Sequence, residues 1–442
     1  MRFSRLFAVA ENKGVSELEV YFANSEGFDV ALFEGNIDSY KVSSSQTLAV
    51  RGIYQGKMGF AVTENIRSSN YEFLIDRLID NAKIMGSTFV ERIFEGSPKY
   101  KRVSYKKSDF HLVSVEDKIS DLKKLEQEAL NYDPRIVKVD HCSYEEKKAG
   151  VEIYNTKGLK LKKKYQYGVF VLSVVAKDGD STKTVFDYTI ANTYADLKPF
   201  DLVKNICDEA ISGLHPQKIK TKKYPVILRN DVAASLLAAF EPVFNGESAV
   251  KGLTWLKDKK DELIASKKVT IIDNPVYKDA IIKMPFDDEG VACKEKKIVD
   301  KGVFKLFLNN LKTAAKLNEE PTGNGFKASP ASSVGVSSHN LYIKNGRTSY
   351  EDMVSSIKEG VIITSVAGLH SGVNTVSGDF SIQSSGFYVK DGKIAHPVTL
   401  LVLSGNFYDM LKQVDKIGND LKFRGNQIGS PSLKIKKMSI SS

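Results

Sequence analysis

Histidines are the side chains of this sequence best suited to bind a metal or to transfer a proton near neutral pH. The 442 residues contain six: His111, His141, His215, His339, His370 and His396. A zinc-binding helix places two histidines one turn apart on one face, and no pair here has that spacing. A site assembled from distant residues stays open as an alternative, with His370, Asp379 and His396 as its candidates.

Motifs for nucleophilic catalysis and phosphate binding are absent from the sequence. It has no G-x-S-x-G elbow, and "GNGFKAS" (323–329) lacks the G-K-S/T ending of a phosphate loop. The stretch "DVAASLLAAFEPVFNG" (231–246) predicts one short helix that ends at Gly246. Its single carboxylate, Glu241, precedes Pro242, which disturbs the last helical turn. We therefore interpret Glu241 as a surface or capping group and not as a general base.

The segment 372–406 combines regularly spaced glycines with alternating strands, and "KDGK" (390–393) is a strong hairpin signal. Small residues in a strand let a second backbone approach closely. One interpretation is a sheet edge or surface that accepts an extended peptide as an added strand. The other is that these glycines only turn and twist the sheet. The candidate peptide-contact residues are Gly378, Asp379, Phe380, Ser381, Ser384, Ser385 and His370.

The N-terminal elements that must support such sites combine strands and helices. Short alternating strands over 17–63 predict an antiparallel meander. Turn signals interrupt this meander at 25–27, 34–36 and 55–56. Amphipathic helices are predicted over 68–86, 114–131 and 199–214.

The C-terminal elements are mostly short strands with glycine turns. Helices interrupt them at about 349–358 and 406–417, and the Gly/Ser-rich stretch 322–340 is predicted to be a long loop. Strands with segregated helices indicate an α+β fold and argue against a doubly wound parallel sheet. We expect an N-terminal α/β domain with an antiparallel meander and helices at 1–220, and a β-rich C-terminal domain with a few helices at 221–442.

Composition narrows the class of protein further. The formal net charge of +10 comes from scattered lysine runs mixed with acidic residues, which indicates solvated surface and disfavours a nucleic-acid groove. Cys142, Cys207 and Cys293 are far apart and encode neither a disulfide framework nor a zinc cluster. The sequence shows no signal-peptide core and no apolar run near the ~20 residues that cross a bilayer. The expected location is therefore the cytoplasm, with no membrane partner.

Five stretches together resemble the TldD/PmbA family, in the family's order and over essentially the whole chain. They are "EGNIDSYKVSSSQTLAVRGIYQGKMGFAVT" (34–63), "FDDEGV" (286–291), "DKGVFKLFLNNLKTAAKLNEEPTGNG" (300–325), "GDFSIQSSGFYVKDGK" (378–393) and "LSGNFYDMLKQVDKIGNDL" (403–421). The chain is more similar to the PmbA branch, also called TldE, than to the TldD branch. The resemblance implies a cytoplasmic peptidase assembly in which a TldD-type catalytic chain pairs with a PmbA/TldE-type chain and trims unfolded peptides.

The resemblance also bears on the metal site. In TldD-type chains the helix after the domain junction carries His-Glu-x-x-x-His, and a cysteine near the C-terminus completes a zinc site. The corresponding positions here hold Leu237, Ala238 and Pro242, and the stretch 423–435 that would carry the cysteine has none. Without ligands, a chain cannot hold the ion that lowers the pKa of a bound water. The resemblance therefore implies no catalytic or metal-binding residues here, and zinc only in a TldD-type partner.

Taken together, these implications describe a non-catalytic subunit that forms part of a peptide chamber or binds the peptide. Its partner would be a TldD-type catalytic subunit or, as a homodimer, a second copy of itself. Two alternatives stay open. One is an independent peptidase with a non-standard site near His370 and His396. The other is a nucleic-acid-associated or gyrase-associated binding protein that uses its basic surface, although nothing in the sequence itself encodes binding to DNA gyrase.

Overall fold

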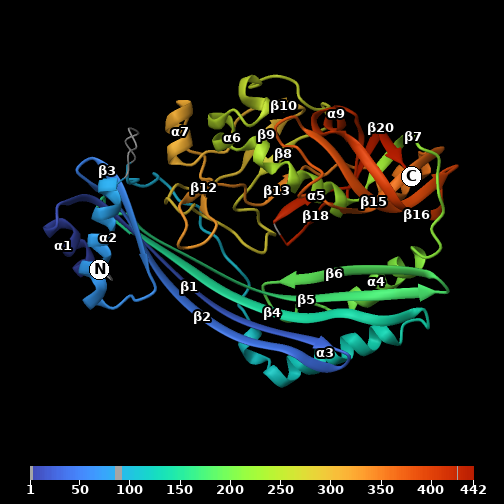
Figure 1. The fold of residues 1–442 in the computed structure, drawn as a ribbon, viewed down its shortest axis with the longest axis horizontal. Helices are drawn as coiled ribbons and strands as arrows, with labels where there is room; N and C mark the ends of the chain where they lie inside the picture. Colours follow the sequence, from blue (N-terminus) through green and yellow to red (C-terminus); the bar gives the residue numbers. More distant parts are fainter. Residues whose placement is uncertain (1–2, 85–91, 426) are drawn as a thin grey trace.

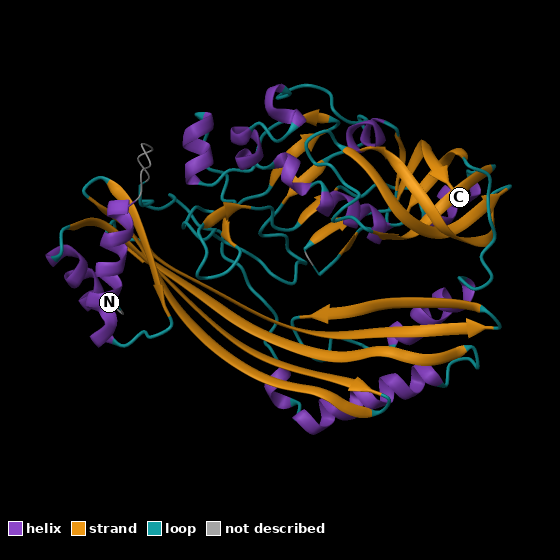
Figure 2. Cartoon of the chain, in the orientation of Figure 1, coloured by secondary structure: helices purple, strands orange, loops and turns teal. Residues whose placement is uncertain are grey.

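The computed structural model describes residues 3–84, 92–425 and 427–442. The chain has a mixed α+β fold, as the sequence predicts, with one large sheet in its N-terminal half and two in its C-terminal half (Figure 1). Figure 2 shows long strands running together through the N-terminal half, with helices along one side of them.

The N-terminal half is organised around a six-stranded antiparallel sheet with the order β3-β2-β1-β4-β5-β6. Its strands are β1 (Val15–Phe33), β2 (Asn36–Tyr54), β3 (Lys57–Thr63), β4 (Ile136–Asn155), β5 (Lys160–Asp178) and β6 (Ser181–Ala191). The predicted antiparallel meander is confirmed, although most of its strands are far longer than the sequence suggests. The turns at 34–36 and 55–56 are confirmed too, since Gly35 and Gly56 both have positive φ angles.

The turn predicted at 25–27 is wrong. Residues Ser25 to Gly27 lie inside β1 and pair with β2 on one side and β4 on the other. A Cβ at position 27 would lie 2.7 Å from the hydroxyl oxygen of Ser43 on the neighbouring strand. Gly27 therefore marks a close approach of the Ser43 side chain and not a change of chain direction.

Four helices cover one face of this sheet: α1 (Ser4–Asn12), α2 (Tyr71–Ile84), α3 (Val115–Leu130) and α4 (Asp201–Ser212). Val20 and Phe22 of β1 pack with α1 and α2, while Val30 and Leu32 pack with α3 and α4. Alternate residues of a strand share a face, so all four helices lie on the same side. The three predicted helices are confirmed, except that residues 85 and 86 lie outside the described ranges.

The opposite face of the sheet is turned toward the C-terminal half. Tyr21 and Ala23 of β1 and Ile153 of β4 pack there with Phe286. In Figure 1 the C-terminal half lies above the sheet, on the side away from α3. The two halves of the chain therefore share an apolar contact at the motif 286–291.

The larger C-terminal sheet closes on itself. Its strands are β7 (Lys222–Leu228), β14 (Glu359–Ala367), β15 (Asp379–Lys390), β16 (Lys393–Asn406), β17 (Val414–Ile417) and β20 (Leu433–Ser441). Their order is β16-β15-β14-β7-β20-β17, and β16 also pairs with the end of β20. Five strands thus form a closed ring, with β17 beside the first residues of β20.

The second C-terminal sheet has the order β10-β9-β8-β13-β19-β18. Its strands are β8 (Ile271–Asp273), β9 (Lys296–Asp300), β10 (Val303–Phe304), β13 (Leu341–Ile343), β18 (Lys422–Phe423) and β19 (Ile428–Ser430). A separate hairpin joins β11 (Gly325–Lys327) to β12 (Val334–Val336). The long loop predicted at 322–340 is therefore wrong for this part of the stretch, because backbone pairing needs no apolar pattern to form.

Short helices complete the C-terminal half: α5 (Asn230–Ala239), α6 (Gly246–Lys251), α7 (Leu311–Leu317), α8 (Tyr350–Ser355) and α9 (Phe407–Lys412). The helix predicted over 406–417 ends at Lys412, because Val414 and Ile417 are buried and belong to β17. One hydrophobic core joins both sheets, with Val226 and Val361 from the ring and Ile271 and Ile298 from the second sheet.

Candidate functional site

The helix after the domain junction differs from its prediction. α5 ends at Ala239, a 3-10 turn follows at Glu241–Phe244, and Gly246 begins α6 instead of ending a helix. A Cβ at position 246 would overlap the side-chain oxygen of Asn309. Gly246 is therefore required by the close approach of Asn309, and Pro242 explains why the helix breaks before it.

The positions that correspond to the histidines and glutamate of a zinc motif carry no metal-binding atoms. Leu237 is 1% exposed and belongs to the hydrophobic core, and neither Ala238 nor Pro242 has a donor atom in its side chain. Across the described ranges, no three or more His, Cys, Asp and Glu side chains are grouped so as to hold a metal ion. In the stretch 423–435, Asn426 lies outside the described residues. The residues at this place do not fit a zinc ion.

Glu241 is not a simple surface group. It is half-buried, and its carboxylate accepts a hydrogen bond from the backbone N–H of Ser338 at 2.7 Å. The amide nitrogen of Asn245 donates a second bond at 3.2 Å. Burial raises the pKa of Glu241 above its usual value, with these hydrogen bonds acting in the opposite direction. The carboxylate anchors the loop before β13, a role that the sequence pattern did not indicate.

The predicted peptide-contact residues lie in and just before β15. This strand pairs with β14 on one side and with β16 on the other, so a peptide cannot be added along either of its edges. Phe380 and Ser384 are buried, which removes them from any peptide-contact surface. Ser381 is exposed and its hydroxyl lies 3.2 Å from that of Ser404. Contact through exposed side chains stays a prediction.

The remaining members of that group have local structural partners. Gly378 has a φ angle of +86° in the turn before β15, a conformation that favours glycine. Asp379 accepts a hydrogen bond from the amide of Asn406 at 2.9 Å, and hydrogen bonding to Asn406 lowers its pKa. Ser385 accepts a hydrogen bond from Lys183 of β6 at 3.2 Å, which ties the ring to the N-terminal sheet.

The geometry gives the distant histidine site no support. His396 stacks on Tyr388 with ring centroids 5.1 Å apart, and its Nδ1 lies 3.1 Å from the carbonyl oxygen of Pro397. His370 is exposed in the segment between β14 and β15. These two histidines and Asp379 are not part of any metal-holding group among the residues that the structure describes.

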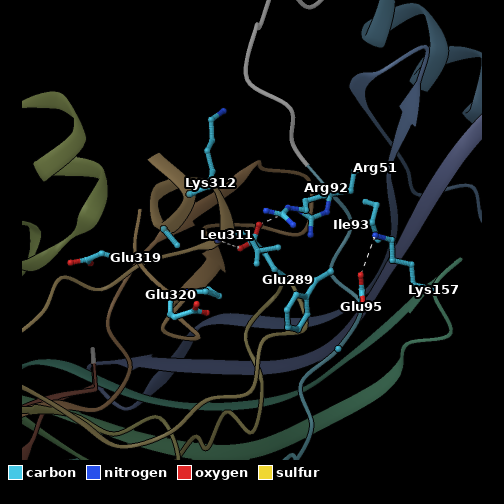
Figure 3. A pocket seen from close by; sticks show the side chains of 15 residues that line it. Arg51, Arg92, Ile93, Glu95, Lys157, Glu289, Leu311, Lys312, Glu319 and Glu320 are labelled. Atoms are coloured by element: carbon cyan, nitrogen blue, oxygen red, sulfur yellow. Dashed lines mark hydrogen bonds and ion pairs between the residues drawn. The ribbon is translucent and has the colours of Figure 1, made fainter. Parts of the chain in front are cut away.

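A pocket between the two halves of the chain is lined by charged side chains from both of them (Figure 3). Its volume is about 610 Å³. One wall comes from the N-terminal half, with Arg51, residues 92–96 and Lys157. The other wall comes from the C-terminal half, with Glu289, residues of α7 and the segment 319–321. Concave sites of about 300–1,000 Å³ are typical for small ligands.

An ion-pair cluster joins the two walls of this pocket. The guanidinium of Arg51 donates to Glu19 at 2.7 and 3.2 Å and to Glu289 at 3.0 Å. The second carboxylate oxygen of Glu289 accepts the backbone N–H of Leu311 at 2.7 Å. Glu19 and Glu289 are only 1% and 3% exposed, and burial raises the pKa of Glu19 against the opposing charge of Arg51.

Next to Glu289, the motif 286–291 forms the rest of the domain junction. Lys163 of β5 donates to Asp288 at 2.8 Å and to the carbonyl oxygen of Phe286 at 3.1 Å. Asp287 accepts backbone N–H groups of Glu289, Val291 and Gly325 at 2.8 to 3.0 Å. Burial, strengthened by the charge of Glu289, raises the pKa of Asp287 to about 8. Asp287 and Asp288 are thus buried, and their carboxylates bind backbone N–H groups and the ammonium of Lys163.

From the sequence, the motif 286–291 indicated only a resemblance to a family. Its position at the contact between the two halves of the chain was not predicted. Its three consecutive acids were the available signal, because buried acids need partners. The partner Arg51 lies 238 residues earlier, and no local pattern connects the two.

Family models settle the relationships of the chain. Models described as PmbA/TldA metallopeptidase domain 1, central domain and C-terminal domain match residues 18–82, 108–214 and 221–442. The chain belongs to the PmbA/TldD metallopeptidase family. The motifs in the sequence predicted this family. The strands covered by the first two family models form one continuous sheet in the structure.

Two curated members of the PmbA/TldD family are similar over most of the chain. "Metalloprotease PmbA" of Escherichia coli O157:H7 is 26% identical over 428 residues, which cover 94% of this chain and 91% of that protein. "Metalloprotease PmbA homolog" of Haemophilus influenzae is 29% identical over 340 residues, covering 75% and 72%.

Solved structures share the fold. A Thermotoga maritima protein described as a modulator of a DNA gyrase is 33% identical, with a TM-score of 0.91 and coverage of 99% of this chain and 98% of that one. TldE from Thermococcus kodakarensis also has a TM-score of 0.91, covering 99% and 100% at 21% identity, which shows the common fold. In this chain, none of the described helices is long and apolar enough to cross a membrane.

Proposed function

We propose that this chain is a PmbA/TldE-like, non-catalytic subunit of a cytoplasmic metallopeptidase assembly that degrades unfolded peptides. The observation that carries the proposal is the replacement of the zinc-motif positions by Leu237, Ala238 and Pro242, with Leu237 packed in the core. A metallopeptidase obtains its nucleophile from a metal-bound water. A chain without the ligands depends on another subunit for that step, and a TldD-type chain is the expected source of the zinc ion.

The names of related proteins support this division of labour. One relative, "Zinc metalloprotease TldD homolog" of Saccharolobus solfataricus, is 25% identical over 98% of both chains. The family thus includes a protein named for zinc-dependent catalysis beside proteins named PmbA and TldE. In the proposed assembly, this chain contributes surface to the peptide chamber, and the Arg51 cluster keeps its two halves in a fixed relation.

The test is metal analysis and peptidase assay of the purified chain, alone and mixed with the TldD-type relative of the same organism. An unfolded, fluorescently labelled casein serves as the substrate. We expect no stoichiometric zinc and no cleavage by the chain alone, and faster cleavage by the mixture than by the relative alone. Tightly bound zinc, or cleavage by the chain alone that a chelator abolishes, would refute the proposal.

The oligomeric state separates the two possible assemblies. Light scattering of the chain alone and of the mixture shows whether it forms a homodimer, a complex with the TldD-type chain, or both. Homologous subunits commonly associate through the same surface, so a self-associated form is expected to dissociate when the catalytic partner is added. A homodimer that persists in the presence of the relative, with no mixed complex, would contradict the paired assembly.

A further inference from the structure

Most charged groups that line the pocket between the two halves already have partners. Arg51 is held by Glu19 and Glu289. On the same wall Lys157 lies 3.2 Å from a carboxylate oxygen of Glu17. On the opposite wall the carboxylate of Glu319 accepts a hydrogen bond from Lys260 at 2.7 Å. These groups are committed to holding the protein together.

Two charged side chains of the lining differ from the rest. Arg92 on the N-terminal wall and Glu320 on the C-terminal wall are exposed, and neither has an ion pair or hydrogen bond with another residue in the described ranges. Figure 3 shows Arg92 and Glu320 on separate segments that border the pocket. Among the described lining residues, Arg92 and Glu320 can thus bind a ligand without first breaking an internal ion pair.

Apolar side chains also line this pocket. Ile93 and Phe94 follow Arg92 on one wall, and Leu311 and Ala315 of α7 stand on the other. A ligand that fits this pattern carries a carboxylate at one end, an ammonium at the other and a neutral body between them. Charge-assisted hydrogen bonds at both ends provide orientation, while contact with the apolar lining provides area.

We propose that this pocket binds a short peptide with free ends, its α-carboxylate on Arg92 and its α-ammonium on Glu320. The inference rests on the proposed function for the choice of a peptide as ligand. A single amino acid has the same two charges, but a cavity of about 610 Å³ lies in the range that holds drug-sized ligands and accommodates a longer body. The site retains short peptide products or the ends of a longer substrate.

Isothermal titration of the purified full chain with trialanine tests the site. We expect trialanine to bind, and its C-terminal amide to bind about tenfold more weakly because one charge-assisted contact is lost. Arg92→Gln should weaken the binding of trialanine by the same factor and should not change the binding of the amide. The reason is that the substitution and the amidation remove the same charge-assisted contact. N-acetyl-trialanine and Glu320→Gln form the corresponding pair at the other end. Arg102→Gln and Glu64→Gln, at exposed positions outside the lining, are the matched controls.

Three outcomes would overturn the inference. They are the absence of trialanine binding at millimolar concentration, equal binding of free and blocked peptides, and binding of alanine as tight as that of trialanine. Arg92→Lys keeps the charge and should retain binding within about threefold, which separates loss of charge from a folding defect. The titration needs neither zinc nor a partner. Zinc in the chain would refute the proposed function alone, whereas unselective binding would refute the pocket alone.

Discussion

The Arg51 cluster allows a quantitative test of what holds the two halves together. Arg51→Met keeps most of the side-chain length but removes the cation from two buried carboxylates, Glu19 and Glu289, which are 1% and 3% exposed. Breaking a buried pair by removing one partner costs about 3–5 kcal/mol, because the remaining charge stays uncompensated. Against a total stability of about 5–15 kcal/mol this is a large loss. We expect a clear decrease of the urea unfolding midpoint at pH 7, followed by circular dichroism.

The pH dependence of this loss follows from the sign of the pKa shift. Burial already raises the pKa of Glu19 in the folded chain, and removing Arg51 raises it further. The folded state then binds more protons than the unfolded state above the ordinary carboxyl pKa, so stability falls as the pH rises through that window. The difference between Arg51→Met and the wild type should therefore be largest at pH 8 and should shrink toward pH 5.

Two further variants decide whether charge is the cause. Glu19→Gln and Glu289→Gln, added together to Arg51→Met, remove the uncompensated charges and should recover at least half of the lost stability. Arg102→Met, at an exposed position, should change stability by less than about 0.5 kcal/mol. A loss below about 1 kcal/mol in Arg51→Met, or a loss that the two glutamine substitutions leave unchanged, would refute the reasoning.

Three other predictions concern packing and titration. Gly386→Ala should destabilise the chain by about 3 kcal/mol or more, because the added Cβ would overlap the carbonyl oxygen of Ile362 in the ring. Gly335→Ala should cost less than about 1 kcal/mol, because the nearest atom to its added Cβ is 3.7 Å away. Equal melting temperatures of the two variants would contradict this prediction. The three buried cysteines should not react with Ellman's reagent in the folded chain at pH 8 and should react fully in guanidinium. Burial raises the pKa of the Cys142 thiol to about 12 and that of Cys207 to about 11, so few reactive thiolates form at pH 8. Rapid labelling of the native chain would show that the cysteines are not buried. Burial lowers the pKa of Lys327 from 10.5 to about 8, so its stability cost is present below pH 8 and disappears as the pH rises toward 10.5. The free energy of unfolding of Lys327→Met, relative to that of the wild type, should accordingly be highest at pH 7 and lowest at pH 10.5. A difference in the free energy of unfolding that does not change with pH would exclude this titration.

Features that depend on a few neighbouring residues were predictable from the sequence. Ser114 and Ser349 cap their helices, with each hydroxyl accepting the backbone N–H three residues later. The hairpin at 390–393 has positive φ angles at Asp391 and Gly392, as its turn residues indicate. These structures form from contacts within one turn, and the sequence states those contacts directly.

Features that depend on distant residues were not predictable. Gly27 and Gly246 resemble local stop signals, yet both lie inside or at the start of an element, against side chains that other segments bring close. Glu241 looks like a surface carboxylate until the loop carrying Ser338 covers it. A residue's burial and its partners are set by packing between segments, and no nearby pattern records them.

The sequence by itself determined which donor atoms this chain has. It established that the positions of a zinc motif hold Leu237, Ala238 and Pro242, a fact that no folding can change. Only the tertiary structure decided where the remaining charges are used. It pairs Arg51 with Glu289 across 238 residues and leaves Arg92 and Glu320 exposed on the walls of one pocket. The physical reason is that chemical identity belongs to a single residue, whereas burial and charge pairing depend on how distant segments pack.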